Sequence, residues 1–248
     1  MKQKLVWKRL DVLLVERGLG KSPEEAAAMI LAGEVQVDGM CADKAGTLFA
    51  SNAKIAVVSR HQKYVSRGGF KLEGALKSFS VDPTKLVCLD VGSSHGGFTD
   101  CLLQHGATRI YAVDVNVDQL DWKLRQDPRV VPVKRNARDL QPLDIADPVD
   151  LVTIDVSFIS VEKILQPAVK LAKPGAIFLI LIKPQFELPR GQVAEGGIVK
   201  TKSLREKAVL LVQKHAQSLG LRRLTVRPSR VTGAEGNQEY FLHARKKA

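Results

Sequence analysis

The pattern of apolar and polar positions in the first 60 residues predicts a small α+β unit. Apolar residues recur at helical spacing in two segments, and the second segment begins after Ser22-Pro23-Glu24-Glu25. This tetrapeptide predicts a helix start because it combines a capping serine, a proline at the first helical position and a glutamate that completes a capping box. Strand-like alternation then meets the Asp38-Gly39 turn, which is typical of a hairpin. The predicted elements are helices at residues 9–17 and 23–32 and strands at residues 34–37 and 54–59.

From residue 81 onwards, short apolar strands alternate with helical segments. The expected strands are 86–91, 109–113, 129–133, 151–154, 176–182, 220–228 and 239–244, and the expected helices are 98–105, 117–125, 160–171 and 203–218. This alternation predicts a parallel sheet covered by helices on both faces, which is a doubly wound, Rossmann-like α/β domain. We therefore expect three regions: an α+β domain at residues 1–60, a linker and lead-in helix at 61–80, and the α/β domain at 81–248. Residues 184–202, rich in proline and glycine, predict a long loop over the crevice of that domain.

The charge distribution points to a polyanionic partner. The formal net charge is +12, with a pI near 9.7. Residues 61–77 carry four Lys or Arg against one Asp or Glu, and residues 200–248 carry twelve against three. The excess is thus confined to the linker and the C-terminal fifth, which is the expected footprint of nucleic-acid binding.

Composition argues against several classes of protein. The three cysteines have neither metal-ligand nor redox spacing, which is typical of reduced thiols in a cytosolic protein. The N-terminal segment lacks the apolar region of a signal peptide, because Arg9, Asp11 and Glu16 interrupt it. The longest purely apolar run, Ala176–Ile182, is too short to span a bilayer. We therefore expect a cytoplasmic protein with no metal site and no membrane partner.

A glycine-rich loop follows the first strand of the α/β domain. Residues 90–98, DVGSSHGGF, form a strand, a glycine turn and a helix start, where backbone N–H groups are free to approach a ligand. The loop lacks the GxGxxG order of dinucleotide-binding proteins and the Lys-Ser/Thr of a P-loop. Asp114, at the end of the next strand, can accept two hydrogen bonds from a diol.

Four polar residues distant in the sequence are expected to meet near this loop: Lys71, Asp155, Lys183 and Glu239. They lie at the ends of predicted sheet strands or in the lead-in helix, and such positions converge on the crevice outside the carboxyl edge of a doubly wound sheet. Two lysines and two carboxylates indicate a transfer reaction on a poorly acidic hydroxyl. Lys183 is the candidate base or proton-orienting group, and Lys71 anchors a substrate phosphate or shares the hydrogen bonds around the hydroxyl. Taken singly, each residue is more often part of a surface salt bridge than catalytic.

The loop and the four polar residues resemble those of FtsJ-like RNA methyltransferases. Residues 90–98 match D-x-G-x-x-x-G-G-F, the S-adenosylmethionine loop of that family, and the order Lys–Asp–Lys–Glu is the signature of ribose 2′-O-methyltransferases. Asp155-Val156-Ser157-Phe158 also lacks the prolines of the D/N-P-P-Y/F tetrad of amino-group methylases. The resemblance implies S-adenosylmethionine as cofactor. The residues expected to bind it are Asp90, Gly92, Ser94, Gly96, Gly97, Phe98, Asp114, Asn136 and Ala137.

Other segments resemble the TlyA (hemolysin A) family, in which an S4-type (alpha-L) RNA-binding domain precedes an FtsJ-like domain. The matching segments are residues 7–60 for the S4-type domain and KYVSRGGFKLEGAL (63–76), TIDVSFIS (153–160), LIKPQFE (181–187) and GNQEYFLH (236–243) for the rest. One departure is that Pro23 and two glutamates follow the capping Ser22, where S4-type modules usually have an arginine.

This second resemblance implies a cytidine 2′-O-methyltransferase that acts on ribosomal RNA, 23S and in some members 16S as well. Its partners are then ribosomal RNA and ribosomal subunits, and we expect a monomer or weak dimer. Residues 63–66 correspond to an interdomain linker that affects cofactor binding in the family. The candidate RNA-binding residues are Lys8, Arg9, Lys21, Lys44, Arg60, Lys63 and Arg67, with the basic C-terminal segment.

Two other functions stay open at this point. The protein could be a non-catalytic ribosome-associated RNA-binding factor, against which the presence of all four polar residues argues. It could also be a membrane-active hemolysin, but the sequence has neither a spanning helix nor a long amphipathic apolar stripe.

Overall fold

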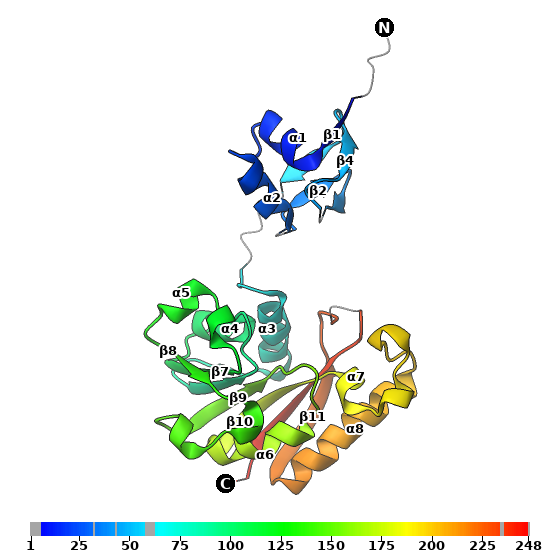
Figure 1. Cartoon of the computed structure of the whole chain (residues 1–248). Coiled ribbons are helices and arrows are strands. Elements are labelled where there is room, and N and C mark those ends of the chain that lie inside the picture. Colours follow the sequence, from blue (N-terminus) through cyan, green and yellow to red (C-terminus); the bar gives the residue numbers. More distant parts are fainter. Residues whose placement is uncertain (1–5, 32, 43, 58–62, 234–235, 248) are drawn as a thin grey trace. The chain divides into compact units, whose positions relative to one another are not determined.

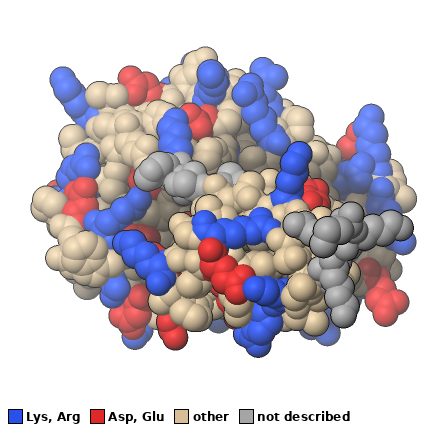
Figure 2. Space-filling model, turned by 90° about the horizontal axis from the view of Figure 1, so that it is seen from above, with Lys and Arg blue, Asp and Glu red and all other residues tan. Residues whose placement is uncertain are grey.

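The computed structural model describes residues 6–31, 33–42, 44–57, 63–233 and 236–247 (Figure 1). The chain divides into two compact units, Met1–Lys63 and Tyr64–Ala248. Lys and Arg side chains are spread over the face drawn in Figure 2, intermixed with Asp and Glu. Among the described residues, no helix combines the length and the apolar composition needed to cross a membrane.

The N-terminal unit is a small α+β fold, as predicted. Its elements are β1 (Trp7–Arg9), α1 (Leu10–Glu16), α2 (Pro23–Leu31), β2 (Val35–Val37), β3 (Met40–Cys41), β4 (Leu48–Ala50) and β5 (Ile55–Val57). The predicted start of α2 is confirmed: the Ser22 hydroxyl accepts a hydrogen bond from the backbone N–H of Glu25, and the Glu25 carboxylate accepts one from the N–H of Lys21. Apolar side chains of both helices, among them Leu10, Leu14 and Ile30, are fully buried against the strands.

The C-terminal unit is built on a seven-stranded sheet in the order β11-β12-β10-β9-β6-β7-β8. Its strands are β6 (Val87–Val91), β7 (Arg109–Asp114), β8 (Val130–Lys134), β9 (Val149–Ile154), β10 (Ala172–Ile182), β11 (Leu221–Pro228) and β12 (Tyr240–Lys246). The α-helices are α3 (Arg67–Phe79), α4 (Gly97–Gln104), α5 (Trp122–Arg125), α6 (Glu162–Leu171), α7 (Pro184–Glu187) and α8 (Lys202–Ser218). Short 3-10 helices are η1 (Val117–Gln119), η2 (Ala137–Asp139), η3 (Pro142–Asp144), η4 (Arg190–Gln192) and η5 (Glu195–Gly197).

Helices cover both faces of this sheet, which confirms the doubly wound prediction. Figure 1 shows α3, α4 and α5 on one side and α6 and α8 on the other. Each side has its own apolar core, one containing Leu179 and Phe241 and the other containing Phe178 and Leu242. Because strand side chains alternate between the two faces, central strands buried on both sides read as continuous apolar runs.

Three details of this unit differ from the sequence prediction. The sheet is not wholly parallel, because β12 pairs antiparallel with both β10 and β11. The expected helix at residues 117–125 is divided into η1 and α5, with Asp121 capping α5 by accepting a hydrogen bond from the N–H of Lys123. The expected loop at 184–202 contains α7, which Pro184 begins, together with η4 and η5.

Candidate active site

The glycine loop after β6 is pressed against the end of β9. Gly92 has φ +84°, and a Cβ added to it would collide with the backbone carbonyl of Asp155. The N–H groups of Gly92 and Ser93 both donate to the carbonyl of Val113 at the end of β7. Glycine is therefore required at position 92, because two strand ends approach each other there more closely than a side chain permits.

Two residues predicted to bind the cofactor lie away from the cavities of this region. Asp90 is fully buried and accepts hydrogen bonds from the hydroxyls of Thr99 (2.6 Å) and Thr153 (3.0 Å). Burial raises the pKa of the Asp90 carboxyl to about 7. Gly96 has φ +94°, and a Cβ there would meet Leu124 and Leu120. Neither residue lines the two cavities described next, since Asp90 is bonded to Thr99 and Thr153 and Gly96 packs against Leu120 and Leu124; their part in cofactor binding stays a prediction.

A large cavity, about 1210 Å³, opens along the carboxyl ends of β6, β7 and β9. Five of the predicted cofactor residues line it: Gly92, Ser94, Asp114, Asn136 and Ala137. The Asp114 carboxylate is held in place by three donors, the N–H groups of Ser94 and Asn116 and the side-chain amide of Gln119. Residues of the lining that sequence reasoning missed include Val115, Gln119, Ile159, Phe186 and Arg190.

The hydrogen-bond acceptors and apolar groups of this cavity fit S-adenosylmethionine. Asp114 offers carboxylate oxygens for a ribose diol, and the valine and isoleucine side chains at positions 113, 115, 156, 159 and 164 offer an apolar wall for a purine. Asn136 and Ala137, at the start of η2, also line this cavity. When bound, this cofactor supplies a sulfonium-activated methyl group.

A smaller cavity, about 250 Å³, shares Gly92, Ser94, Asp155 and Ser157 with the larger one. Lys71 and Lys183 line it as well, from α3 and from the end of β10. The two cavities therefore adjoin at the glycine loop. Gly97 and Phe98, the remaining predicted cofactor residues, line the smaller cavity.

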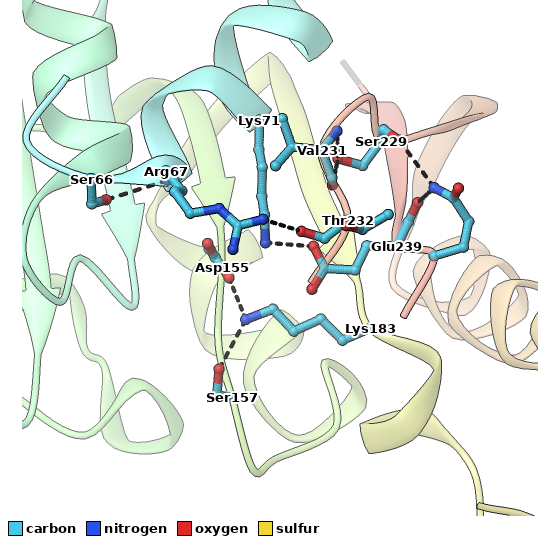
Figure 3. A network of polar contacts seen from close by, with 12 residues as sticks. Ser66, Arg67, Lys71, Asp155, Ser157, Lys183, Ser229, Val231, Thr232 and Glu239 are labelled. Carbon is cyan, nitrogen blue, oxygen red and sulfur yellow. Dashed lines mark hydrogen bonds and ion pairs between the residues drawn. The ribbon is translucent and has the colours of Figure 1, made fainter. Parts of the chain in front are cut away.

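The four polar residues lie together here as two ion pairs (Figure 3). The Nζ of Lys71 is 2.6 Å from Oε2 of Glu239, and the Nζ of Lys183 is 2.6 Å from Oδ1 of Asp155. Lys183 also donates to the hydroxyl of Ser157 at 2.9 Å. Both lysine side chains are 11% exposed and Glu239 is 2% exposed, so these pairs are far less screened than surface pairs.

Close backbone packing at the start of α3 positions Lys71. Ser66 caps the helix by accepting from the N–H of Gly68, and a Cβ on Gly97 of α4 would collide with the Ser66 hydroxyl. A Cβ on Gly69 would collide with the ring of Tyr64. The segment 64–69 is thus locked onto α4, and Lys71, one helical turn further on, points to Glu239.

The candidate RNA-binding residues have different surroundings. In the N-terminal unit, Lys8 pairs with Glu16 at 2.6 Å and Arg9 pairs with Asp11 at 2.6 Å, whereas Lys21 and Lys44 are exposed. Lys63 is exposed, and Arg67 donates to the carbonyl of Thr232 at 3.1 Å. Arg60 lies outside the described residues.

Three further residues of the site had weak or no sequence signals. Ser157 binds Lys183, and its position two residues after Asp155 could have indicated it. Thr232 lines the smaller cavity from the loop between β11 and β12, which has no motif of its own. Phe158 lines the large cavity with 91% of its surface exposed. Among the described residues, no group of three or more His, Cys, Asp or Glu side chains could hold a metal ion.

The fold and the site define a class of protein. Residues 64–246 match the family model described as FtsJ-like methyltransferase, and residues 8–55 match the model of the S4 domain. The chain is therefore an S-adenosylmethionine-dependent methyltransferase of the FtsJ-like class that carries an S4 domain.

Comparison with individual proteins narrows this class. The chain is 45% identical over 239 residues to the "16S/23S rRNA (cytidine-2'-O)-methyltransferase TlyA" of Mycobacterium tuberculosis, covering 96% of this chain and 89% of the relative. It is 40% identical to "Hemolysin A" of Brachyspira hyodysenteriae, covering 95% and 98%. A solved structure of a candidate hemolysin from Streptococcus thermophilus superposes with a TM-score of 0.76 at 38% identity, covering 97% and 89%. The chain belongs to the TlyA (hemolysin A) family, which confirms the resemblance seen in its motifs.

Proposed function

We propose that this protein methylates the 2′-hydroxyl of a cytidine in ribosomal RNA, with S-adenosylmethionine as the methyl donor. The observation that carries the proposal is the presence of two largely buried ion pairs, Lys71–Glu239 and Lys183–Asp155, beside the glycine loop. The S4 domain, the positive net charge and the names of the relatives support ribosomal RNA as substrate. In line with the relatives, the substrate is 23S RNA, 16S RNA or both.

Lys183 is the group that handles the proton in this mechanism. Its ammonium has three N–H groups: one donates to the hydroxyl of Ser157, Asp155 is its ion-pair partner at 2.6 Å, and a remaining N–H can donate to the ribose oxygen. Methyl transfer to the ribose oxygen would release the hydroxyl proton, and a group beside that oxygen would have to take it up. Lys183 releases one proton to Asp155, turns the freed lone pair towards the hydroxyl and accepts the hydroxyl proton, which restores the ammonium. Ser157 holds Lys183 in position throughout.

Lys71 and Glu239 keep the opposite side of the cavity ordered. Two ammonium groups and two carboxylates balance in charge, so the site admits a cationic cofactor without net repulsion from these four residues. The Lys71 ammonium lies where it can contact the phosphate or the hydroxyl of the target nucleotide. Most of the acceleration then comes from alignment, which can supply roughly 7–11 kcal/mol.

An exposed aromatic side chain marks the place of the target base. Phe158 has φ +66°, a conformation that costs energy for a bulky residue, and its ring lies 5.3 Å from that of Phe186 at the cavity wall. This arrangement directs an apolar ring surface towards solvent beside Asp155 and Ser157. A nucleotide turned out of its helix can stack on Phe158 while its ribose enters the smaller cavity.

The experiment is methyl transfer with purified protein, followed by mapping of 2′-O-methyl positions in 16S and 23S RNA. The full chain is incubated with S-adenosylmethionine and with either free RNA or isolated subunits. We expect modified cytidines with wild type and none with Lys183→Ala. Wild-type protein that binds S-adenosylmethionine and RNA yet leaves every ribose unmodified would refute the proposal. As ribosomal RNA is the proposed substrate, we propose that the protein acts in the cytoplasm, as a monomer or weak dimer.

A further inference from the structure

The edge of the sheet formed by β11 and β12 carries a concentrated positive charge. In residues 221–233 and 236–247 there are seven Lys or Arg, and the acidic residue in these described ranges is Glu239. Glu239 is buried and already paired with Lys71, so it does not offset the charge of the surface. The strands on this edge therefore differ from the rest of the α/β unit, where basic and acidic side chains are mixed.

The strand register places several of these groups on one face. Thr225 pairs with His243, and Arg227 pairs with Phe241. Residues that are paired across antiparallel strands share a face, and Phe241 belongs to the core beneath α3 and α4. Arg245, two residues after His243, lies on that face as well. Val226 and Leu242, on the opposite face, pack in the core beneath α6 and α8.

Contacts with α3 hold this face in shape. The rings of Phe79 and His243 stack at 5.3 Å, and the guanidinium carbon of Arg227 lies 6.0 Å from the centre of the Phe79 ring. The aliphatic part of Arg230 lies over Gly74, 3.5 Å from the position of a Cβ there. Thr225, Arg227, Arg230, His243 and Arg245 thus form one ordered surface, called here the C-terminal basic surface.

The C-terminal basic surface is continuous along the chain with the smaller cavity. Arg230 is followed by Val231 and Thr232, and Thr232 lines that cavity and accepts a hydrogen bond from Arg67. Figure 3 shows the segment Ser229–Thr232 beside Lys71 and Glu239. A ligand lying on this surface therefore extends towards the point where a target ribose would enter.

We propose that the C-terminal basic surface binds the phosphate backbone of the substrate RNA next to the target nucleotide. The inference rests on the proposed function and adds a specific docking site to it. Arginine is suited to this task, because its planar donors match phosphate oxygens and its charge persists at any physiological pH. Threonine can donate to a phosphate too. Burial and the neighbouring Arg245 lower the pKa of His243, so this histidine serves as a neutral stacking partner rather than as a charge.

The test compares the full-length double variant Arg227→Gln/Arg230→Gln with Lys214→Gln and wild type. Lys214 is an exposed cation on α8, on the other side of the sheet. Binding to protein-free ribosomal RNA is measured at several salt concentrations, without cofactor, so the result does not depend on methyl transfer. We expect the double variant to bind at least ten-fold more weakly, with a slope of log affinity against log salt smaller by about 1.4–1.8. Its affinity for S-adenosylmethionine and its melting temperature should match wild type.

Two results would overturn this inference. One is an RNA affinity and salt slope in the double variant equal to those of Lys214→Gln. The other is weaker binding to assembled ribosomal subunits with unchanged binding to protein-free RNA, which would assign the surface to a ribosomal protein instead. If wild type transfers no methyl group but its RNA binding still depends on Arg227 and Arg230, the docking site stands and the proposed activity fails.

Discussion

Lys71 and Glu239 are 168 positions apart in the chain, yet their charged groups meet at 2.6 Å. Lys71 comes from α3, which precedes the sheet, and Glu239 directly precedes β12, the strand between β11 and β10. β12 is antiparallel to its neighbours, so its first residue lies at the edge where the parallel strands end. The reversed direction of one strand therefore allows Glu239 to complete the site.

Removal of the Glu239 charge is predicted to destabilise the unit. In Glu239→Gln, Lys71 keeps its charge in a position that is 11% exposed and loses its partner. Loss of a hydrogen bond to a charged group costs about 1.5–3 kcal/mol, measurable by urea unfolding. The double variant Lys71→Met/Glu239→Gln should recover part of this loss, because no charge is left unpaired. Equal unfolding free energies for wild type and Glu239→Gln would show that the pair contributes nothing.

Loss of Lys183 is predicted to slow methyl transfer strongly and to spare cofactor binding. Lys183→Ala should lower kcat by about 10²–10⁴-fold, the usual contribution of a positioned acid or base. Its affinity for S-adenosylmethionine, measured by calorimetry, should stay within a few-fold of wild type. Lys173→Ala is the matched control, because Lys173 makes a similar ion pair with Asp150 at the other end of β10. The assigned role is wrong if the Lys183 and Lys173 variants turn over at the same rate.

Gly92 is predicted to be intolerant of a methyl group for two separate reasons. In Gly92→Ala the side chain suffers the strain of positive φ and also overlaps the carbonyl of Asp155. Gly175 has φ +78° with no atom within 4 Å of a built Cβ, so Gly175→Ala isolates the strain alone, about 1–2 kcal/mol. We expect Gly92→Ala to melt lower than this control and to lose on the order of 10²-fold in activity, because Asp155 is displaced. Similar melting and activity in the two variants would contradict the close approach.

The periodicity of apolar side chains predicted the architecture of the α/β unit correctly. The continuous apolar run of β10 and the alternation of strands with helices are enough to predict a doubly wound sheet, and the order of strand ends brings Asp155 and Lys183 together. The direction of β12 was predicted wrongly, because a strand has the same side-chain period in either direction. The position of Asp90 and Gly96 outside both cavities was not predicted, because a motif gives positions in a loop and not which of them face a cavity. The packing of Ser66 and Gly97 depends on two helices meeting, which no local pattern reveals.

Buried Asp90 is predicted to give the unit a pH-dependent stability. Its pKa in the folded protein is raised to about 7, above the ordinary value of 3.8. The folded state therefore binds the proton more tightly, and the contribution of this group to stability is fully present below about pH 4 and lost as the pH rises through 7. Asp90→Asn keeps hydrogen bonding with Thr99 and Thr153 but cannot ionise. Melting curves at pH 5 and pH 8 should show a smaller difference for this variant than for wild type; an unchanged difference would mean that Asp90 does not titrate in this range.

Phe158 is predicted to stack on a base of the substrate RNA. Its ring is 91% exposed, so its replacement by alanine removes little packing, and relief of the unfavourable φ differs little between the two residues. Stacking of one base is worth about 1–3 kcal/mol, which corresponds to a loss of about 5- to 150-fold in kcat/KM for Phe158→Ala. Phe158→Trp should retain activity, because any aromatic ring can stack. Leu143→Ala, at another exposed apolar residue on η3, is the matched control and should behave as wild type. If Phe158→Ala and Leu143→Ala have the same kcat/KM, the base does not stack at position 158, and the exposed ring needs another explanation.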